Sequence, residues 1–141
     1  MSLTSVFNIA GSSLSSQAVR MNTTASNMAN TESVSSTKEG VYKPRLPVFT
    51  PKEVDRQLDF FENQRSWGVE VHQIVEKDVD GIAIHSPDHP LADENGYIYK
   101  ANVNMMEEMA NMISASRSYQ NSVEVFNTTK AMINKTIQLG G

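Results

Sequence analysis

Apolar residues recur with a seven-residue period at both ends of the chain, and this period is the strongest pattern in the sequence. Near the N-terminus the recurring positions are Leu3, Phe7, Leu14, Met21 and Met28. Near the C-terminus they are Met105, Met109, Met112, Tyr119, Val123, Phe126, Ile133 and Ile137. Steps of three and four residues place such positions along one side of a helix. The pattern predicts two terminal helices that pair as the chain folds back on itself and that pack against neighbours.

The C-terminal helix is predicted to be long, because residues 103–138 contain neither proline nor glycine. Asn102 or Asn104 is the candidate N-cap, and Glu107 and Glu108 follow in the first turns, where the helix dipole favours negative charge. At 1.5 Å per residue, these residues would form a rod about 54 Å long. A rod of this length needs partners beyond the rest of a chain of 141 residues.

The middle of the chain predicts extended structure. Prolines at positions 44, 47 and 51 forbid a long helix before about residue 52, so an arm is expected there, with Val41, Tyr42, Leu46, Val48 and Phe49 along a neighbouring surface. The stretch 54–66 is ambiguous, with Leu58, Phe60 and Phe61 as the expected buried group. Further on, a β-rich run at 69–75, turn residues at 78–81 and a second run at 82–84 predict a hairpin.

We therefore predict an α+β fold in four segments. They are an N-terminal helix (1–31), an extended arm or linker (32–66), a small β-hairpin-containing region (67–101) and a C-terminal helix (102–139).

Charge distinguishes the ends from the middle. The net charge is −4, yet Arg20 is the one charged residue between positions 2 and 31. The other positions of that segment that lie off the apolar stripe are rich in Ser, Thr and Asn, which are mediocre helix formers. We interpret them as packing closely against other chains, where unpaired charge would be costly; the alternative is a poorly ordered, serine-rich terminus. No basic surface indicates nucleic-acid binding, and no apolar run is long enough to span a bilayer.

The residues that could carry chemistry do not predict an enzyme. The densest cluster is His85, Asp88, His89, Asp93 and Glu94. Two histidines four residues apart could bind zinc on a helix, but the prolines at 87 and 90 favour a polar turn instead. The methionines at 105, 106, 109 and 112 could form a peptide groove, and ordinary helix packing is the simpler interpretation. The chain has no cysteine; no catalytic residue, metal site or cofactor is predicted.

Three motifs carry a family resemblance. They are Asn27-Met28-Ala29-Asn30-Thr31, Glu39-Gly40-Val41-Tyr42-Lys43-Pro44 and the run from Met109 to Gln120. Together they resemble the rod and hook axial proteins of the bacterial flagellum, and the stretch 89–104 narrows the resemblance to the proximal rod type. One departure is Tyr119-Gln120-Asn121-Ser122, where the family usually has Ala-Asn after the glutamine or glutamate.

The resemblance implies an antiparallel coiled coil of the terminal helices, in which Asn27 and Asn30 join the apolar stripe as pairing or assembly residues. It implies a structural subunit of the basal-body rod, assembled helically with its own copies and other rod proteins into a hollow shaft that transmits torque and passes export substrates. Export by the flagellar type III apparatus without a cleaved signal peptide is also implied, with no nucleic acid or membrane insertion. The alternative function is a secreted coiled-coil adaptor or an export chaperone.

Overall fold

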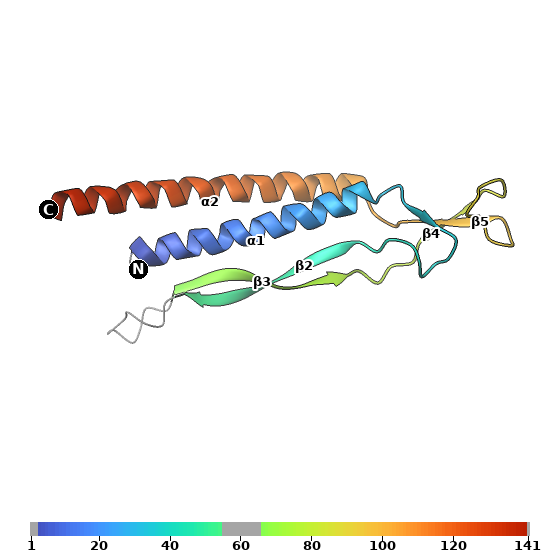
Figure 1. Ribbon diagram of the computed structural model, residues 1–141, viewed down its shortest axis with the longest axis horizontal. Coiled ribbons are helices and arrows are strands. Elements are labelled where there is room, and N and C mark those ends of the chain that lie inside the picture. The colour runs from blue at the N-terminus through green and yellow to red at the C-terminus, as the bar shows by residue number, and fades with distance from the viewer. Residues whose placement is uncertain (1–2, 55–65, 141) are drawn as a thin grey trace. The chain divides into compact units, whose positions relative to one another are not determined.

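The computed structural model describes residues 3–54 and 66–140, and the predicted α+β class is confirmed (Figure 1). The helices are α1 (Leu3–Ala29) and α2 (Met105–Gly140). The strands are β1 (Val34–Ser35), β2 (Arg45–Val54), β3 (Ser66–Glu76), β4 (Ile82–His85) and β5 (Tyr97–Lys100). The group Leu58, Phe60 and Phe61, which we expected to be buried, lies outside the described residues.

Both helix boundaries follow from polar side chains. At the start of α2, Asn104 Oδ1 accepts hydrogen bonds from the backbone N–H groups of Met106 (3.0 Å) and Glu107 (3.3 Å), so Asn104 is the N-cap. At the end of α1, Thr31 Oγ1 donates to the Met28 carbonyl (2.9 Å) and Asn30 Nδ2 to the Ser26 carbonyl (2.8 Å). The same carbonyls also accept from the backbone N–H groups of Asn30 (3.2 Å) and Thr31 (3.3 Å), so the side chains reinforce the last turn of α1, which ends at Ala29.

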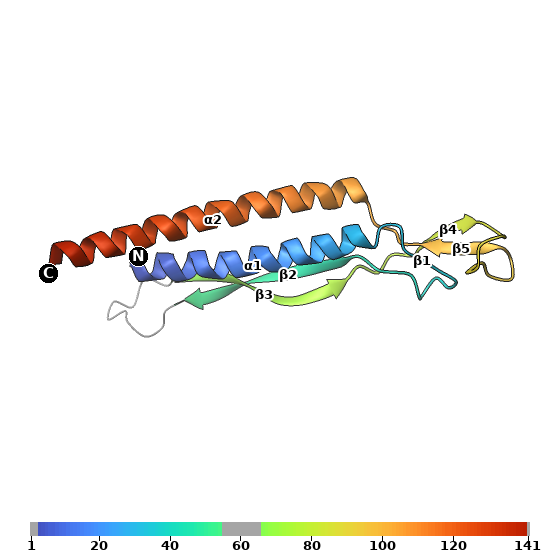
Figure 2. The same ribbon diagram turned by 45° about the horizontal axis from the view of Figure 1, so that its top comes forward.

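The strands form two small sheets, and their pairing corrects the predicted hairpin. The strand at 66–76 pairs with β2, whereas β4 pairs antiparallel with β5 in a sheet of order β1-β5-β4 (Figure 2). The β4–β5 hairpin therefore lies within the predicted β region, but the pairing of 69–75 with 82–84 is wrong. β2 also includes Leu46, Val48 and Phe49 of the predicted arm, and Val41 of the same arm is buried within its own chain.

The positions of the turns explain why β4 pairs with β5 and not with β3. The hairpin is closed at Asp93–Gly96, where Asp93 Oδ1 accepts from the N–H groups of Asn95 (2.9 Å) and Tyr97 (2.8 Å), and Gly96 has φ +79°. Gly81 serves a different purpose, because a Cβ there would lie 3.0 Å from Val41 Cγ1 and 3.1 Å from the Lys100 carbonyl oxygen. Glycine at position 81 thus allows close approach to β5 and does not make a turn back onto β3.

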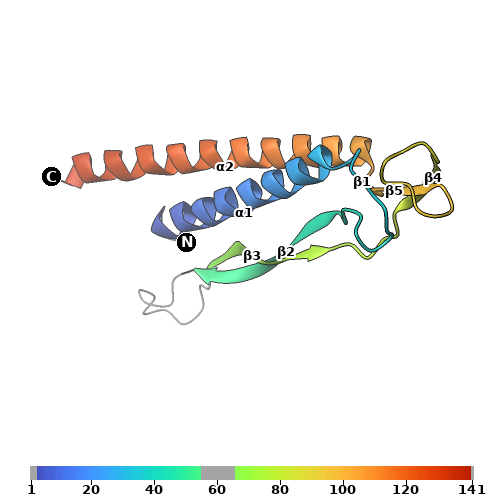
Figure 3. The ribbon, with the colours of Figure 1, turned by 45° about the vertical axis from the view of Figure 1, so that its right-hand side comes forward.

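The chain divides into two compact units. The first unit contains Met1–Val19, Val48–Gln73 and Ser114–Gly141, and the second contains Arg20–Pro47 and Ile74–Ile113. In the first unit, α1 holds the backbone of β3 through two serines one turn apart. Ser12 Oγ accepts from the Val69 N–H (3.2 Å), and Ser16 Oγ donates to the Val69 carbonyl (3.1 Å). β2 and β3 run side by side in Figure 3, so these serines satisfy a residue on the edge of that pair.

Among the described residues, the buried apolar side chains are Ala10, Val41, Ile98, Ala101 and Ala115, and three of these five are alanines. Many large apolar side chains remain exposed, including Met106 (73%) and Leu139 (90%). Neither helix, as far as the structure describes it, contains a stretch long and apolar enough to cross a membrane. The described part of the chain therefore leaves many large apolar side chains in contact with water.

Candidate assembly site

In the first unit, α1 and α2 are joined by an aromatic and a hydroxyl contact. The rings of Phe7 and Phe126 pack with centroids 4.0 Å apart and planes inclined by 33°. Ser13 Oγ and Ser122 Oγ lie 2.9 Å apart, and Ser122 Oγ is also placed to donate to the Ser118 carbonyl (3.0 Å). As α1 advances from Phe7 to Ser13, its partner on α2 moves back from Phe126 to Ser122. The two helices therefore run in opposite directions in this unit.

In the second unit, polar side chains join the same two helices. Arg20 Nη2 donates to Asn111 Oδ1 (3.4 Å), and Asn27 Nδ2 donates to Glu108 Oε1 (3.0 Å). The order of the partners is again reversed, from Asn111 back to Glu108. Figure 3 shows the end of α1 beside the start of α2, where the Asn27–Glu108 bond lies.

The structure places the predicted pairing residues in three environments. Asn27 is buried, with 1% of its surface exposed. The half-buried residues are Phe7, Leu14, Met21, Met28, Asn30, Met112, Tyr119, Val123, Phe126 and Ile133. The exposed residues are Leu3, Met105, Met109 and Ile137. Of the predicted set, Phe7 and Phe126 are in direct ring contact with each other, and Asn27 contacts α2 through a residue outside the set.

The innermost line of α2 was missed by sequence reasoning. It consists of Glu108, Ala115, Ser122 and Thr129, which follow one another at intervals of seven residues. Three of these are buried, and Ser122 is half-buried against Ser13. The same seven-residue period that identified the large apolar residues could have found Ala115, Ser122 and Thr129, had small residues been counted as helix-packing positions; Glu108 gave no such signal.

Three serines of α1 and Asn27 bond to other elements of the chain. Ser12 and Ser16 bond to Val69, Ser13 to Ser122, and Asn27 to Arg45. The packing of this helix against other chains stays a prediction. The physical reason for a charge-poor helix stands, because these positions are enclosed and unpaired charge would be costly there. The enclosing surface is the chain's own β3, α2 and the start of β2.

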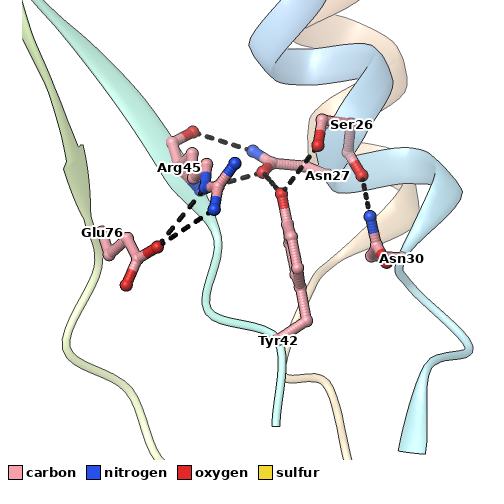
Figure 4. Close-up of polar contacts among 6 residues, drawn as sticks. All are labelled: Ser26, Asn27, Asn30, Tyr42, Arg45 and Glu76. Atoms are coloured by element: carbon pink, nitrogen blue, oxygen red, sulfur yellow. Dashed lines mark hydrogen bonds and ion pairs between the residues drawn. The ribbon is translucent and has the colours of Figure 1, made fainter.

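Asn27 uses all of the hydrogen-bonding capacity of its side chain. Nδ2 donates to the Arg45 carbonyl (2.9 Å) and to Glu108 Oε1 (3.0 Å). Oδ1 accepts from the Arg45 N–H (2.8 Å) and from the Tyr42 hydroxyl (2.8 Å). A primary amide has two donor hydrogens and two acceptor lone pairs, so the group is fully satisfied. The amide of Asn27 faces both Arg45 and Tyr42 in Figure 4.

The 42–45 segment is also held from its other side. The Lys77 N–H donates to the Pro44 carbonyl (2.8 Å), and the Arg45 guanidinium lies 3.3 Å from Glu76 Oε1 (Figure 4). The Arg45–Glu76 ion pair is exposed and contributes little by itself. The hydrogen bonds to the buried Asn27 are therefore the stronger determinants of where this segment lies.

Glu108 is the ionisable group of this site. Burial raises the pKa of its carboxyl above the ordinary value, and the neighbouring charge of Glu107 acts in the same direction. The hydrogen bond from Asn27 and the charge of Lys77 lower the pKa and oppose that effect. A carboxylate that is only 7% exposed is tolerated because Asn27 donates to it.

The histidine and carboxylate cluster lies at the end of β4, which contains His85, and in the β4–β5 connection, and it forms local contacts there. The His85 ring packs edge-on against Tyr97 with centroids 5.0 Å apart, and His89 Nδ1 accepts from the Leu91 N–H (3.1 Å). Hydrogen bonds, first that from the Tyr97 backbone, lower the pKa of Asp93. Within residues 3–54 and 66–140, no group of three or more metal-ligating side chains could hold a metal ion.

Comparison with known proteins identifies the class. Residues 94–139, which include β5 and nearly all of α2, match the family described as Flagellar basal body rod FlgEFG protein C-terminal. This end of the chain is thus similar to the C-terminal part of flagellar rod proteins.

Full-length relatives narrow the class further. The chain is 41% identical to the flagellar basal-body rod protein FlgC of Salmonella typhimurium and 44% identical to that of Yersinia enterocolitica. It is 43% identical to FlgC of Buchnera aphidicola subsp. Schizaphis graminum, and each alignment covers 99% of both chains. The chain therefore belongs to the FlgC family of flagellar basal-body rod proteins. It is accordingly a structural protein of the basal body.

Proposed function

We propose that this protein is a subunit of the proximal rod, in which α1 and α2 pair as an antiparallel coiled coil and pack against neighbouring copies and other rod proteins. The ring contact of Phe7 with Phe126 and the reversed order of partners within each unit support the pairing. The assembled helices form the wall of a hollow helical shaft that transmits torque and lets export substrates pass. The subunit reaches this site through the flagellar type III apparatus.

One observation carries the packing against neighbours: α2 leaves many large apolar side chains exposed beyond those that contact α1. The exposed residues are Met105, Met106, Met109, Ile113, Val125, Met132, Ile137 and Leu139. A helix that is apolar beyond its contact face gains stability when a further surface covers it. The predicted division into terminal helices (1–31 and 102–139), arm (32–66) and β region (67–101) fits this proposal, because the helices then supply the contacts of the shaft.

The similarity to rod proteins over 99% of the chain favours a rod subunit over a secreted adaptor or an export chaperone. An adaptor or chaperone would also need a stable small oligomer in solution. Light scattering on the purified protein distinguishes them, since the rod proposal expects a monomer at low concentration and an adaptor a fixed dimer or tetramer.

Charge insertion on the exposed face of α2 tests the proposal. Met132 is exposed, so Met132→Asp should leave the free chain folded but place an unpaired carboxylate in a subunit interface. We expect rod assembly and swimming to be lost when this variant replaces the wild-type protein in a deletion strain. Asn127→Asp is the matched control, because Asn127 is also exposed on α2 but contributes no large apolar surface. Swimming at the wild-type rate with Met132→Asp would contradict the proposed packing.

A further inference from the structure

The side chain of Asn27 does for Arg45 what a neighbouring β-strand would do. It accepts from the Arg45 N–H through Oδ1 (2.8 Å) and donates to the Arg45 carbonyl through Nδ2 (2.9 Å). Both backbone groups of one residue are thereby paired by one planar amide, as in an antiparallel ladder. The last turns of α1 thus serve as the partner of the first residue of β2 through a side chain that is itself only 1% exposed.

The same amide is bonded to the other helix. The second hydrogen of Nδ2 is donated to Glu108 Oε1 (3.0 Å), so the orientation of the amide plane that binds Arg45 is also the orientation that binds α2. Within the described part of the chain, Glu108 has its hydrogen bond to Asn27 and none to residues 42–45. Glu108 can therefore affect the 42–45 segment chiefly by orienting Asn27.

The Tyr42 hydroxyl makes the connection tighter. It donates to Asn27 Oδ1 (2.8 Å), and Ser26 Oγ lies 3.2 Å from the same tyrosine oxygen. If Asn27 rotated away from Glu108, its oxygen would leave both Tyr42 and the Arg45 N–H. Because a buried group without a partner is expensive, these four bonds are expected to form and break together.

We infer that Asn27 makes docking of the 42–45 segment conditional on the start of α2 lying beside the end of α1. A chain whose terminal helices have not yet met would then carry a loose segment before β2, and pairing of the helices would order that segment in the same step. The inference rests on the proposed function, in which the terminal helices of the subunit pair as a coiled coil. Its physical content, a coupling between position 108 and Arg45 through Asn27, is a property of the folded chain alone.

Amide hydrogen exchange of Arg45 in the full chain, measured by NMR, tests the coupling. Glu108→Ala removes the acceptor on α2 without touching Asn27 or the 42–45 segment. We expect the protection of the Arg45 N–H to fall by about tenfold, the equivalent of roughly 1.4 kcal/mol. Glu107→Ala is the matched control, because Glu107 is the adjacent acid of the same helix turn and is exposed, and it should change Arg45 protection by less than about twofold.

A donor–acceptor exchange provides an independent variant. Asn27→Asp cannot donate to Arg45 or Glu108 and places two carboxylates together, so Arg45 protection should fall by more than about tenfold at neutral pH. Adding Glu108→Gln supplies a donor from α2 to the new carboxylate and should recover a substantial part of that loss, although the lost donor to the Arg45 carbonyl is not replaced. Asn30→Asp, one turn away and bonded to Ser26 within α1, should leave Arg45 unchanged.

Two outcomes would overturn the inference. One is Arg45 protection in Glu108→Ala equal to that in Glu107→Ala, and the other is a double variant no more protected than Asn27→Asp. Both readouts concern the free chain, whereas the rod proposal is tested by assembly and swimming with Met132→Asp. Failure of the coupling with loss of swimming in Met132→Asp would reject this inference alone, and the reverse result would reject the packing proposal alone.

Discussion

The chain has two places where α1 holds the backbone of a strand, and they use different chemistry. In the first unit two hydroxyls, Ser12 and Ser16, take the N–H and carbonyl of Val69 separately. In the second unit the single amide of Asn27 takes both groups of Arg45. Ser12 Oγ also lies 2.8 Å from the Ile9 carbonyl of its own helix, as expected for a hydroxyl that donates locally and accepts from the strand.

The difference lies in how many elements each contact joins. Each serine hydroxyl rotates independently, so losing one leaves the other bond intact. The amide has fixed geometry, and its remaining donor and acceptor positions reach Glu108 and Tyr42. The serine pair thus attaches one strand to one helix, whereas Asn27 joins a strand, the residues before it and two helices. A helix with few charged residues can therefore fix the position of a strand through hydrogen bonds from its Ser and Asn side chains to the backbone of that strand.

Replacement of Asn27 should give the largest effect on stability. Asn27→Leu leaves the Glu108 carboxylate, the Tyr42 hydroxyl and both Arg45 backbone groups without their partner, so we expect the free energy of unfolding to fall by about 3–5 kcal/mol. Urea unfolding followed by far-UV circular dichroism measures it. Asn22→Leu is the control at an exposed position of α1, where less than about 0.5 kcal/mol is expected. A loss below about 1 kcal/mol for Asn27→Leu would show that the four bonds contribute little.

Removal of the serine pair should have a smaller effect. Ser12→Ala with Ser16→Ala deletes two hydrogen bonds to Val69, and we expect a loss of about 1–3 kcal/mol together with faster exchange of the Val69 amide. The single tryptophan, Trp67, lies two residues from Val69 and reports unfolding by fluorescence. Ser15→Ala, at an exposed position between them, is the control. Losses that simply add from the two single variants would agree with independent hydroxyls, whereas strong coupling would remove the contrast with Asn27.

The smallest effect concerns pH. Because burial raises the folded-state pKa of Glu108, its stabilising contribution is complete below the unfolded-state pKa, near 4.5, and is lost as pH rises through the folded-state pKa. Glu108→Gln keeps an acceptor for Asn27 and should be less destabilised than the wild type over that rise, with Glu107→Gln as control. Urea midpoints across this pH range measure the difference. Parallel pH profiles for wild type and Glu108→Gln would contradict the assigned cause.

Local sequence signals predicted the helices well. The absence of proline and glycine from 103–138, with Asn104 as a candidate cap, anticipated α2 closely, and the polar residues after Asn30 marked the end of α1. These features depend on residues a few positions apart, so the local sequence is enough to predict where each helix begins and ends.

Partners distant in sequence could not be predicted in the same way. The strand at 66–76 pairs with β2, not with the nearby 82–84 run. Strand pairing depends on side-chain packing against cross-strand and same-face neighbours, which are distant in sequence. The burial of Glu108 was hidden for a similar reason, since nothing near position 108 indicates that Asn27 lies against it. The motif containing Asn27 did point to a special role, but its hydrogen-bond partners required the structure.

Ala115 has a consequence for which substitutions the chain can accept. It is completely enclosed, seven residues from both Glu108 and Ser122, which bond α1. A larger side chain at 115 would overfill the space and cost about 1–3 kcal/mol. Glycine and serine are the residues of similar size, while exposed residues of α2 such as Met106 have no such limit. Mutational tolerance along α2 should therefore alternate with the turn of the helix, and at position 115 selection acts on volume more than on polarity.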